Sequence, residues 1–372
     1  MATMADELAI LEEACQRRVP RWVGDVPPGT VVGLACSYAP LELFHAAGLT
    51  PLRLQVPGRP APAADSWLPP FTCAPVRGLL GAALEGQLDS LAGFVVPHSC
   101  DTMQELAGIW QTLRPDQWLL TPVEPLAVES PRAPAYLRQE LLALAGCLAE
   151  HLGRPVSDDD LAESIARYNR LRQAVQAVDG LRDRLSATQA WAAISAAWRM
   201  PPETYLQTAG ALIDRLQTVE PAPASAPAVL LAGSVLDEPL IPELVDELGG
   251  RVVGDDLCNG TRDAQVLAAE SGDPWSALAE RLLQRLPCPC KHTPGREPGR
   301  RLAELARRRS AQGVIQILAK FCDPHSFDLV PGRQRLAAAG VAQLALEIDA
   351  TNAPEQLRTR LQAFFELLRA AG

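Results

Sequence analysis

The stretch VVGLACSYAPLELF (Val31–Phe44) predicts how this chain begins to fold. Its first residues, VVGLAC, form a short apolar run that is typical of a buried strand. Pro40 suits the first position of a helix, where its fixed φ fits and its missing N–H leaves no donor unpaired. Cys36 lies between strand and helix, at the edge where open α/β sheets bind ligands. The stretch therefore predicts a strand, a thiol at a binding edge, and a helix.

Short apolar runs of the same kind recur along the chain and are separated by helix-length segments, which predicts parallel sheets. We expect two Rossmann-like, doubly wound α/β domains of about four strands each, with an additional helical region. The expected domains are 1–132, an N-terminal α/β domain; 133–218, a helical region; and 219–372, a C-terminal α/β domain with a linker at 219–228. The predicted strands are Val31–Cys36, Pro51–Val56, Gly93–Val96, Trp118–Thr121, Val229–Ala232, Val252–Gly254, Gly313–Ile317 and Leu344–Ile348.

Composition and missing motifs exclude several classes of protein. The net charge of −10 argues against a broad nucleic-acid-binding surface. No apolar run reaches the roughly 20 residues that span a bilayer, and the N-terminus does not resemble a signal peptide, so we expect a cytoplasmic protein without membrane partners. No glycine-rich G-x-G-x-x-G follows the first strand, which disfavours nicotinamide and flavin binding. The chain also lacks a P-loop and a G-x-S-x-G motif, so any ATP site would belong to another protein.

The nine cysteines are the most informative residue type. No CxxC pair occurs, so any shared ligand would be gathered by the fold. Four of them, Cys36, Cys100, Cys258 and Cys322, lie at or just beyond predicted strand ends, whereas Cys15 and Cys147 are interpreted as buried structural residues on helices. Three thiolates from two facing domains suit an iron–sulfur cluster with one iron left open, or a Cys₃ zinc site. Ordinary core packing remains the alternative for each single cysteine.

Several stretches in order resemble one family, the 2-hydroxyacyl-CoA dehydratase D-component family, which includes benzoyl-CoA reductase subunits. They are ACSYAPLELFHAAGLTPLRL, VVPHSCDTMQELAGIW, SDDDLAESIARYNRLR, GSVLDEPLIPELVDELGGRVVGDDLCNGTR, GVIQILAKFCDPHSFDLV and QLRTRLQAFFELL. They extend from about residue 31 to residue 369, so the resemblance covers nearly the whole chain. Any one of these stretches alone would be weak, but together they are specific.

The resemblance implies a [4Fe–4S] cluster held by three cysteines. Carried over by motif, the ligands are Cys36, Cys100 and Cys322, with Cys73 of FTCAPVRGLLGA as a fourth candidate that could replace Cys36. A related branch binds a double-cubane [8Fe–9S] cluster, and further cysteines leave that alternative open. The KFCDP motif favours the single cluster. The further cysteines are Cys258, Cys288 and Cys290, for which loop packing is the other interpretation.

The resemblance also implies partners and a radical mechanism. Family members pair with a related or identical second subunit and receive single low-potential electrons from an ATP-dependent iron–sulfur activator. The electron reduces the thioester of an acyl-CoA substrate to a ketyl radical, in a dehydratase (a lyase), or serves to reduce an aromatic ring in a benzoyl-CoA reductase. A double-cubane reductase of small molecules and a non-catalytic electron-transfer subunit of the same complex are the alternatives.

Polar residues near the predicted strand ends are further candidates. Ser37 and His98 are the candidate catalytic residues: Ser37, like Ser99, would contact cluster sulfur or substrate unless it caps a helix, and His98 would transfer a proton unless its role is structural. Two aspartates and an arginine, Asp255, Asp256 and Arg262, would line the cleft unless they form an ion pair that shapes the loop. The candidates for binding CoA phosphates are Lys320, Arg358 and the basic run 290–309, for which a solvated surface or salt bridges are the other interpretation.

Overall fold

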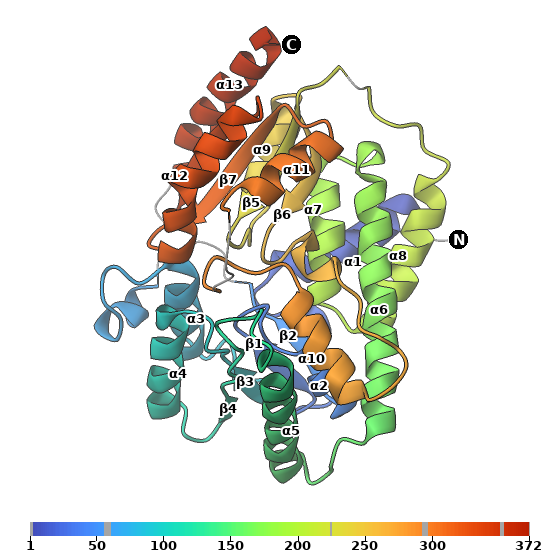
Figure 1. The fold of residues 1–372 in the computed structure, drawn as a ribbon, viewed down its shortest axis with the longest axis vertical. Coiled ribbons are helices and arrows are strands. Elements are labelled where there is room, and N and C mark those ends of the chain that lie inside the picture. Colours follow the sequence, from blue (N-terminus) through green and yellow to red (C-terminus); the bar gives the residue numbers. More distant parts are fainter. Residues whose placement is uncertain (1–2, 56–60, 224, 292–296, 350–352, 372) are drawn as a thin grey trace.

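The computed structural model describes residues 3–55, 61–223, 225–291, 297–349 and 353–371 (Figure 1). It contains two four-stranded sheets in which every neighbouring pair of strands is parallel, ordered β2-β1-β3-β4 and β6-β5-β7-β8. The predicted α/β fold is confirmed, and each predicted strand overlaps an observed one. Val56, the end of the second predicted strand, residue 224 of the predicted linker and residues 292–296 of the basic run lie outside the described residues. The strands are β1 (Val31–Leu34), β2 (Thr50–Arg53), β3 (Gly93–Val95), β4 (Trp118–Leu120), β5 (Ala228–Gly233), β6 (Arg251–Asp256), β7 (Gly313–Ala319) and β8 (Ala342–Ile348).

Helices follow most strands and also fill the middle of the chain. Ser157 caps the longest of them through a capping box with Asp160, as its position before an acidic first turn predicts. Pro40 precedes the first helical residue, Leu41, instead of occupying the first helical position. The helices are α1 (Met4–Gln16), α2 (Leu41–Ala46), α3 (Ala74–Leu84), α4 (Asp101–Leu113), α5 (Ala133–Leu152), α6 (Asp158–Gly180), α7 (Ala187–Ser195), α8 (Pro202–Leu216), α9 (Leu240–Glu247), α10 (Pro274–Gln284), α11 (Arg300–Arg308), α12 (Asp323–Ala338) and α13 (Pro354–Ala371).

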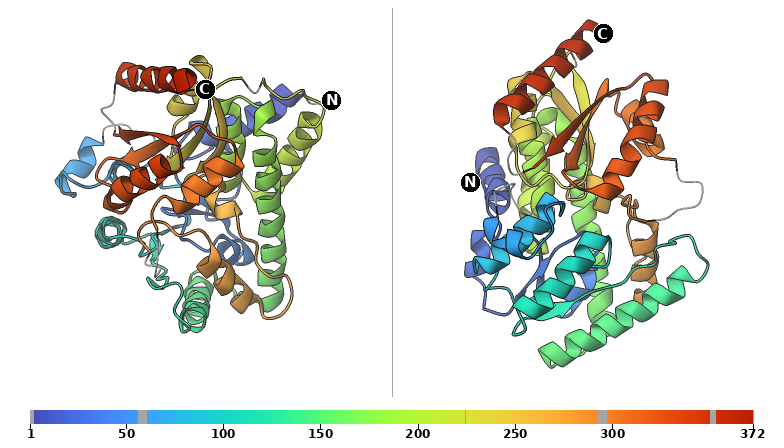
Figure 2. Two further views of the ribbon diagram at one scale, coloured as in Figure 1. Left: turned by 45° about the horizontal axis from the view of Figure 1, so that its top comes forward. Right: turned by 90° about the vertical axis from the view of Figure 1, so that its left-hand side faces the viewer.

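The central strands β1, β3, β5 and β7 are buried on both faces, as expected where helices cover a parallel sheet on both sides, whereas the edge strands β4 and β8 are only partly buried. In β1, Val31 belongs to a core shared with α3 and α4, whereas Val32 and Leu34 face the largest core. That core continues through the central helices to the second sheet, where alternate residues of β5 and β7 join it. Figure 1 shows the two sheets one above the other, with α6 running past both, and Figure 2 shows the same separation from two further directions.

The strand order reverses at one point in each sheet, between β1 and β3 and between β5 and β7. Ligands of open α/β sheets bind in the crevice at such a point, beyond the carboxyl ends of the strands. Gly233 ends β5 there with a φ of +131°, and a Cβ at this position would overlap the carbonyl oxygen of Ile317. Only glycine therefore allows β5 and β7 to approach this closely at the crevice.

The two cysteines expected to be buried on helices differ in the structure. Cys15 is buried in α1, as predicted, but Cys147 is exposed on α5, so its interpretation as a buried structural cysteine is wrong. The reason is that α5 turns this position away from its packed face, which carries Leu137, Leu141, Leu144 and Leu148.

The sequence predicts no membrane-spanning segment. Among the described residues, no helix is both long and apolar enough to cross a membrane.

Candidate functional site

The carboxyl ends of the two sheets meet around a cavity of about 120 Å³, here called the thiol cavity. Its walls come from both halves of the chain, beginning with Ala35 after β1 and ending with His325 in α12. Seven of the nine cysteines line it, which brings together all four thiols predicted as cluster ligands. These cysteines are Cys36, Cys73, Cys100, Cys258, Cys288, Cys290 and Cys322.

Three of the thiols occupy equivalent positions, each at the N-cap of a helix. Cys73 precedes α3, Cys100 precedes α4 and Cys322 precedes α12. A helix N-terminus carries partial positive charge and free N–H groups, so it stabilises a thiolate or another anion placed against it. Cys36 differs, because it lies in the loop between β1 and α2, where its Sγ accepts a hydrogen bond from the Ser99 hydroxyl at 3.6 Å.

Burial opposes charge on these three thiols. Desolvation raises the pKa of Cys73 and of Cys100 to about 11 and that of Cys322 to about 12. In each case the backbone N–H of the residue three positions later favours the thiolate and partly offsets the effect of burial. Near neutral pH the free thiols therefore keep their protons, and a cation that replaces those protons would relieve the cost of burying three charges.

Phe321 gives the turn before Cys322 an unusual backbone, with a φ of +64°. This left-handed region is costly for residues with a Cβ, and most costly for β-branched ones. The Phe321 ring is exposed and lines a second, larger pocket described below, so its conformation is not required by core burial. The turn instead carries the chain from β7 directly into α12 and places Cys322 at the thiol cavity.

We expect Phe321→Val to destabilise the protein by about 1–3 kcal/mol relative to Phe321→Gly, because valine tolerates this φ poorly and glycine adopts it freely. Urea unfolding of the two variants measures the difference. Equal stabilities would mean that the turn relaxes at no cost and that its backbone does not hold Cys322 in place.

A buried polar network joins the Cys36 loop to the Cys288 segment. No motif in the sequence indicates this network. Arg285 lies over the Tyr38 ring, with its Cζ 3.6 Å from the ring centroid, and donates to the Ser37 carbonyl at 2.7 Å. It also pairs with buried Glu124, whose pKa burial raises. The Cys288 N–H donates to the Tyr38 hydroxyl oxygen at 2.8 Å. The network therefore fixes two cysteine-bearing segments relative to each other.

A larger pocket of about 770 Å³, here called the outer pocket, adjoins the thiol cavity. Cys73, Cys100, Cys290 and Cys322 line both, so a molecule in the outer pocket would reach the thiols. His98 lines only the outer pocket, whereas Ser37 lines only the thiol cavity. The two predicted catalytic residues thus lie in neighbouring spaces. Neither Ser37 nor Ser99 is an N-cap, since Pro40 and Cys100 occupy those positions.

Most other charged candidates are engaged within the chain. Asp255 pairs with Arg182, and Asp256 pairs with Arg262 and Arg301, which matches the ion-pair interpretation. Lys320 and Arg358 pair with carboxylates at the surface. In the described part of the basic run, Lys291 is buried against Glu124, and Arg300 and Arg309 also have carboxylate partners. Because these basic residues already pair with carboxylates of the chain, few of the described ones could bind CoA phosphates without breaking an ion pair.

One further residue of the cavity, His325, was not among the sequence-based candidates and is buried in the first turn of α12. Its Nε2 lies 3.9 Å from Cys288 Sγ, and Cys258, Cys288 and His325 offer ligand atoms that all lie within 4.8 Å of one another. One feature of the sequence could have identified His325 as a candidate. It stands three residues after Cys322 in FCDPHSF, about one helical turn from a predicted ligand.

Comparisons with known proteins point in one direction. Residues 36–368 match the model of the family described as 2-hydroxyglutaryl-CoA dehydratase, D-component. The (R)-phenyllactyl-CoA dehydratase beta subunit of Clostridium sporogenes is 25% identical over 342 residues, 91% of each chain. The lactoyl-CoA dehydratase subunit beta of Anaerotignum propionicum is 26% identical over 344 residues, also 91% of each. A benzoyl-CoA reductase subunit of Thauera aromatica is 26% identical over 326 residues, 85% of this chain and 84% of its own.

Proposed function

Because the chain belongs to the 2-hydroxyglutaryl-CoA dehydratase D-component family, we propose that it is an iron–sulfur subunit of a 2-hydroxyacyl-CoA dehydratase or a benzoyl-CoA reductase-type enzyme. One observation carries the proposal. Three thiols, each at a helix N-terminus, converge on one cavity between two doubly wound sheets. That arrangement suits an anionic metal cluster and lacks the glycine-rich turn that a dinucleotide would need.

The donor set fits a [4Fe–4S] cluster. Thiolates are its usual ligands, and we propose Cys100 and Cys322 together with Cys73, whose helix N-terminus matches theirs, in preference to Cys36. Cys36 then lies beside the cluster with Ser99, and their hydrogen bond is of the kind that tunes a redox potential. When bound, such a cluster supplies single low-potential electrons, which an ATP-dependent activator delivers, to an acyl-CoA thioester.

The chain's own residues would bind and orient the substrate and exclude water. The outer pocket would take the acyl-CoA, since four thiols line both it and the thiol cavity. Its exposed aromatic residues, Phe321 and Phe327, offer apolar contact to the acyl group. His98 lies in the same pocket and would hold or move a proton at the substrate. Ser37, at the thiol cavity, would contact cluster sulfur.

The relatives are named as subunits, which supports a related or identical partner chain for this protein. We propose that the partner chain closes the outer pocket, because a low-potential electron must be kept from solvent protons. In the cytoplasm, this chain and its partner chain would form the enzyme, the activator would supply its electrons, and the acyl-CoA would be its substrate.

Iron and acid-labile sulfide analysis of the anaerobically purified chain tests the proposal. We expect a brown protein with about four iron atoms per chain and an EPR signal that appears on reduction. A folded, colourless and iron-free anaerobic preparation would contradict it.

The seven cysteines at the thiol cavity favour a second candidate, a double-cubane [8Fe–9S] reductase of small molecules. Such a cluster needs more thiolates than three, and Cys258, Cys288 and Cys290 would supply them. About eight iron atoms per chain in the same measurement would support this candidate, and about four would exclude it.

A further inference from the structure

We propose that Cys258, Cys288 and His325 form a second metal site, which binds one divalent cation of the zinc class beside the Cys73, Cys100 and Cys322 set. Two sulfur atoms and a ring nitrogen lie within 4.8 Å of one another, and His325 Nε2 is 3.9 Å from Cys288 Sγ. Zinc–ligand bonds of about 2.3 Å to sulfur and about 2.1 Å to nitrogen place tetrahedral donor atoms about 3.5–3.8 Å apart. The donors therefore need only a small adjustment to bind a metal.

The three donors come from separate elements whose backbones are held in place. Cys258 follows β6, and its N–H donates to the Ser234 carbonyl at 2.9 Å while its carbonyl accepts from Arg53 Nη1 at 2.8 Å. Cys288 follows α10 and is held through the Tyr38 hydroxyl. His325 lies in the first turn of α12, which fixes its backbone. A site preorganised in this way does not have to order a loop when the metal binds.

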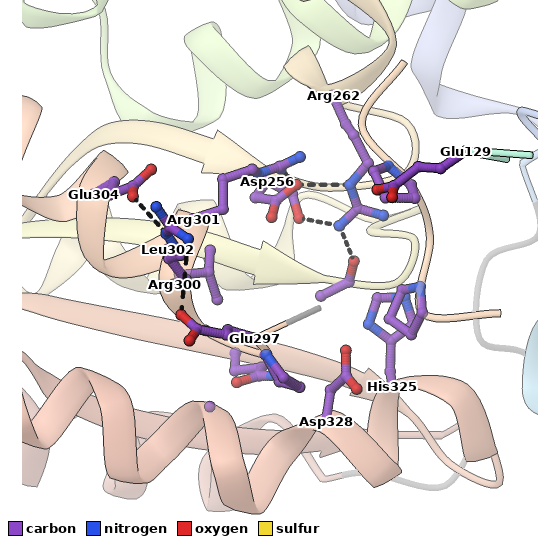
Figure 3. A pocket seen from close by; sticks show the side chains of 17 residues that line it. Glu129, Asp256, Arg262, Glu297, Arg300, Arg301, Leu302, Glu304, His325 and Asp328 are labelled. Atoms are coloured by element: carbon purple, nitrogen blue, oxygen red, sulfur yellow. Dashed lines mark hydrogen bonds and ion pairs between the residues drawn. The ribbon is translucent and has the colours of Figure 1, made fainter. Parts of the chain in front are cut away.

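One charged neighbour, Arg262, favours the Cys258 thiolate that a metal requires, whereas the Cys288 thiol and burial raise the pKa of Cys258 to about 12 in the metal-free chain. Arg262 Nη1 donates to Cys258 Sγ at 3.1 Å, and the same guanidinium is held by Asp256 Oδ1 at 2.6 Å and by the Gly233 carbonyl at 2.9 Å. Figure 3 shows the Arg262–Asp256 contact and, below it, the His325 ring rising from α12, all lining a neighbouring pocket. A fixed guanidinium at a ligating sulfur is a typical outer-shell partner, because it orients the ligand and tunes its basicity.

The donor set indicates zinc chemistry and one open position. Two thiolates and an imidazole suit zinc, whereas a calcium or magnesium site would need oxygen ligands. Three protein ligands leave a fourth tetrahedral position, as in catalytic zinc sites. All three residues line the thiol cavity, so that position faces the space shared with the other cysteines. We infer that it takes water or a substrate oxygen. The site goes beyond the proposed function and does not depend on the cluster.

Cobalt binding to the full-length chain tests the site directly. The four thiols nearest the proposed cluster are first replaced in one variant, Cys36→Ala, Cys73→Ala, Cys100→Ala and Cys322→Ala, and the protein is kept reduced and free of other metals. We expect one equivalent of Co²⁺ to bind, with sulfur-to-cobalt charge-transfer absorption and the visible bands of a tetrahedral site. Adding Cys258→Ala, Cys288→Ala or His325→Gln removes these bands, whereas adding Cys147→Ala leaves them unchanged.

The wild-type protein supplies a second measurement if the multiple variant fails to fold. Elemental analysis of the anaerobically purified chain is expected to find about one zinc per chain beside the iron, and Cys258→Ala loses the zinc but keeps the iron. Arg262→Met is expected to weaken Co²⁺ binding about 10-fold or more. Cobalt bands that survive Cys258→Ala, or loss of about four iron atoms instead of zinc from Cys258→Ala, would overturn the proposal. Zinc without iron in the wild-type protein would keep this site while contradicting the proposed cluster.

Discussion

Single alanine substitutions of Cys73, Cys100 and Cys322 are each expected to lower bound iron from about four atoms per chain to below about one. The physical reason is that three protein thiolates would hold the proposed cluster, and each lies at a helix N-terminus that stabilises negative charge. Anaerobic iron analysis and the EPR signal of the reduced protein measure the loss.

Cys36→Ala and Cys147→Ala are the matched controls. Cys147 is exposed on α5 and lies outside the cavity, so its replacement leaves iron unchanged. Cys36→Ala is expected to retain most of the iron and to shift the reduction potential, since it removes a sulfur that accepts the Ser99 hydrogen bond. Iron lost from Cys36→Ala but kept by Cys73→Ala would show that the helix N-terminus is not what selects the third ligand.

Glu42→Ala is expected to lower the free energy of unfolding by about 3–5 kcal/mol, the largest effect on stability that we expect away from the cavity. Glu42 in α2 pairs with Arg172 in α6, and both side chains are fully buried. Removing the carboxylate leaves a guanidinium in the core without its charge partner. Urea unfolding measures the change. The double variant Glu42→Leu with Arg172→Met is expected to recover most of the stability, because it removes both charges.

The exposed pair between Arg358 and Glu247 provides the comparison. Arg358→Ala is expected to cost less than about 1 kcal/mol, as solvent screens that pair. If Glu42→Ala and Arg358→Ala lowered the free energy of unfolding by similar amounts, burial would not be what makes the Glu42–Arg172 pair important for stability.

The same buried pair predicts a pH dependence with a definite sign. Burial alone would raise the pKa of Glu42, but Arg172 and Arg281 hold it below its ordinary value of 4.5. A carboxyl whose pKa is lower in the folded state adds stability above its unfolded pKa and loses it as the pH falls through the folded value. The wild-type protein should therefore lose this contribution below about pH 4.5, whereas Glu42→Ala should not show that loss. Urea unfolding of both proteins at a series of pH values measures the difference.

Much of the fold was predictable because its signals are local. The central strands β1, β5 and β7 are apolar runs in which nearly every residue is buried, and such a run is visible without knowing what covers it. The N-cap Ser157 was recognisable because a serine stands directly before an acidic first turn. Pro40 and Cys147 show where this reasoning stops. The start of α2 and the side of α5 that faces solvent depend on packing against other elements.

The site was predictable only in part, for the same physical reason. Cys36, Cys100 and Cys322 could be assigned to strand ends from the sequence, since parallel strands present their carboxyl ends at one edge. The position of Cys73 at the start of α3 had no such signal, and it is the reason why we propose Cys73 in preference to Cys36 as the third ligand. Cys288 and His325 are far apart in sequence and meet only through α10 and α12.

The sequence by itself therefore determined the eight strands, the thiols at their ends and the family. The tertiary structure alone decided which thiols share a cavity and that a histidine joins two of them. Contacts between such distant residues depend on how the two sheets are held together. Long-range interactions do this, such as those of Arg285 with Tyr38 and of Arg53 with the Cys258 carbonyl. Local patterns carry no information about those contacts, because their energies arise only after distant segments have packed together.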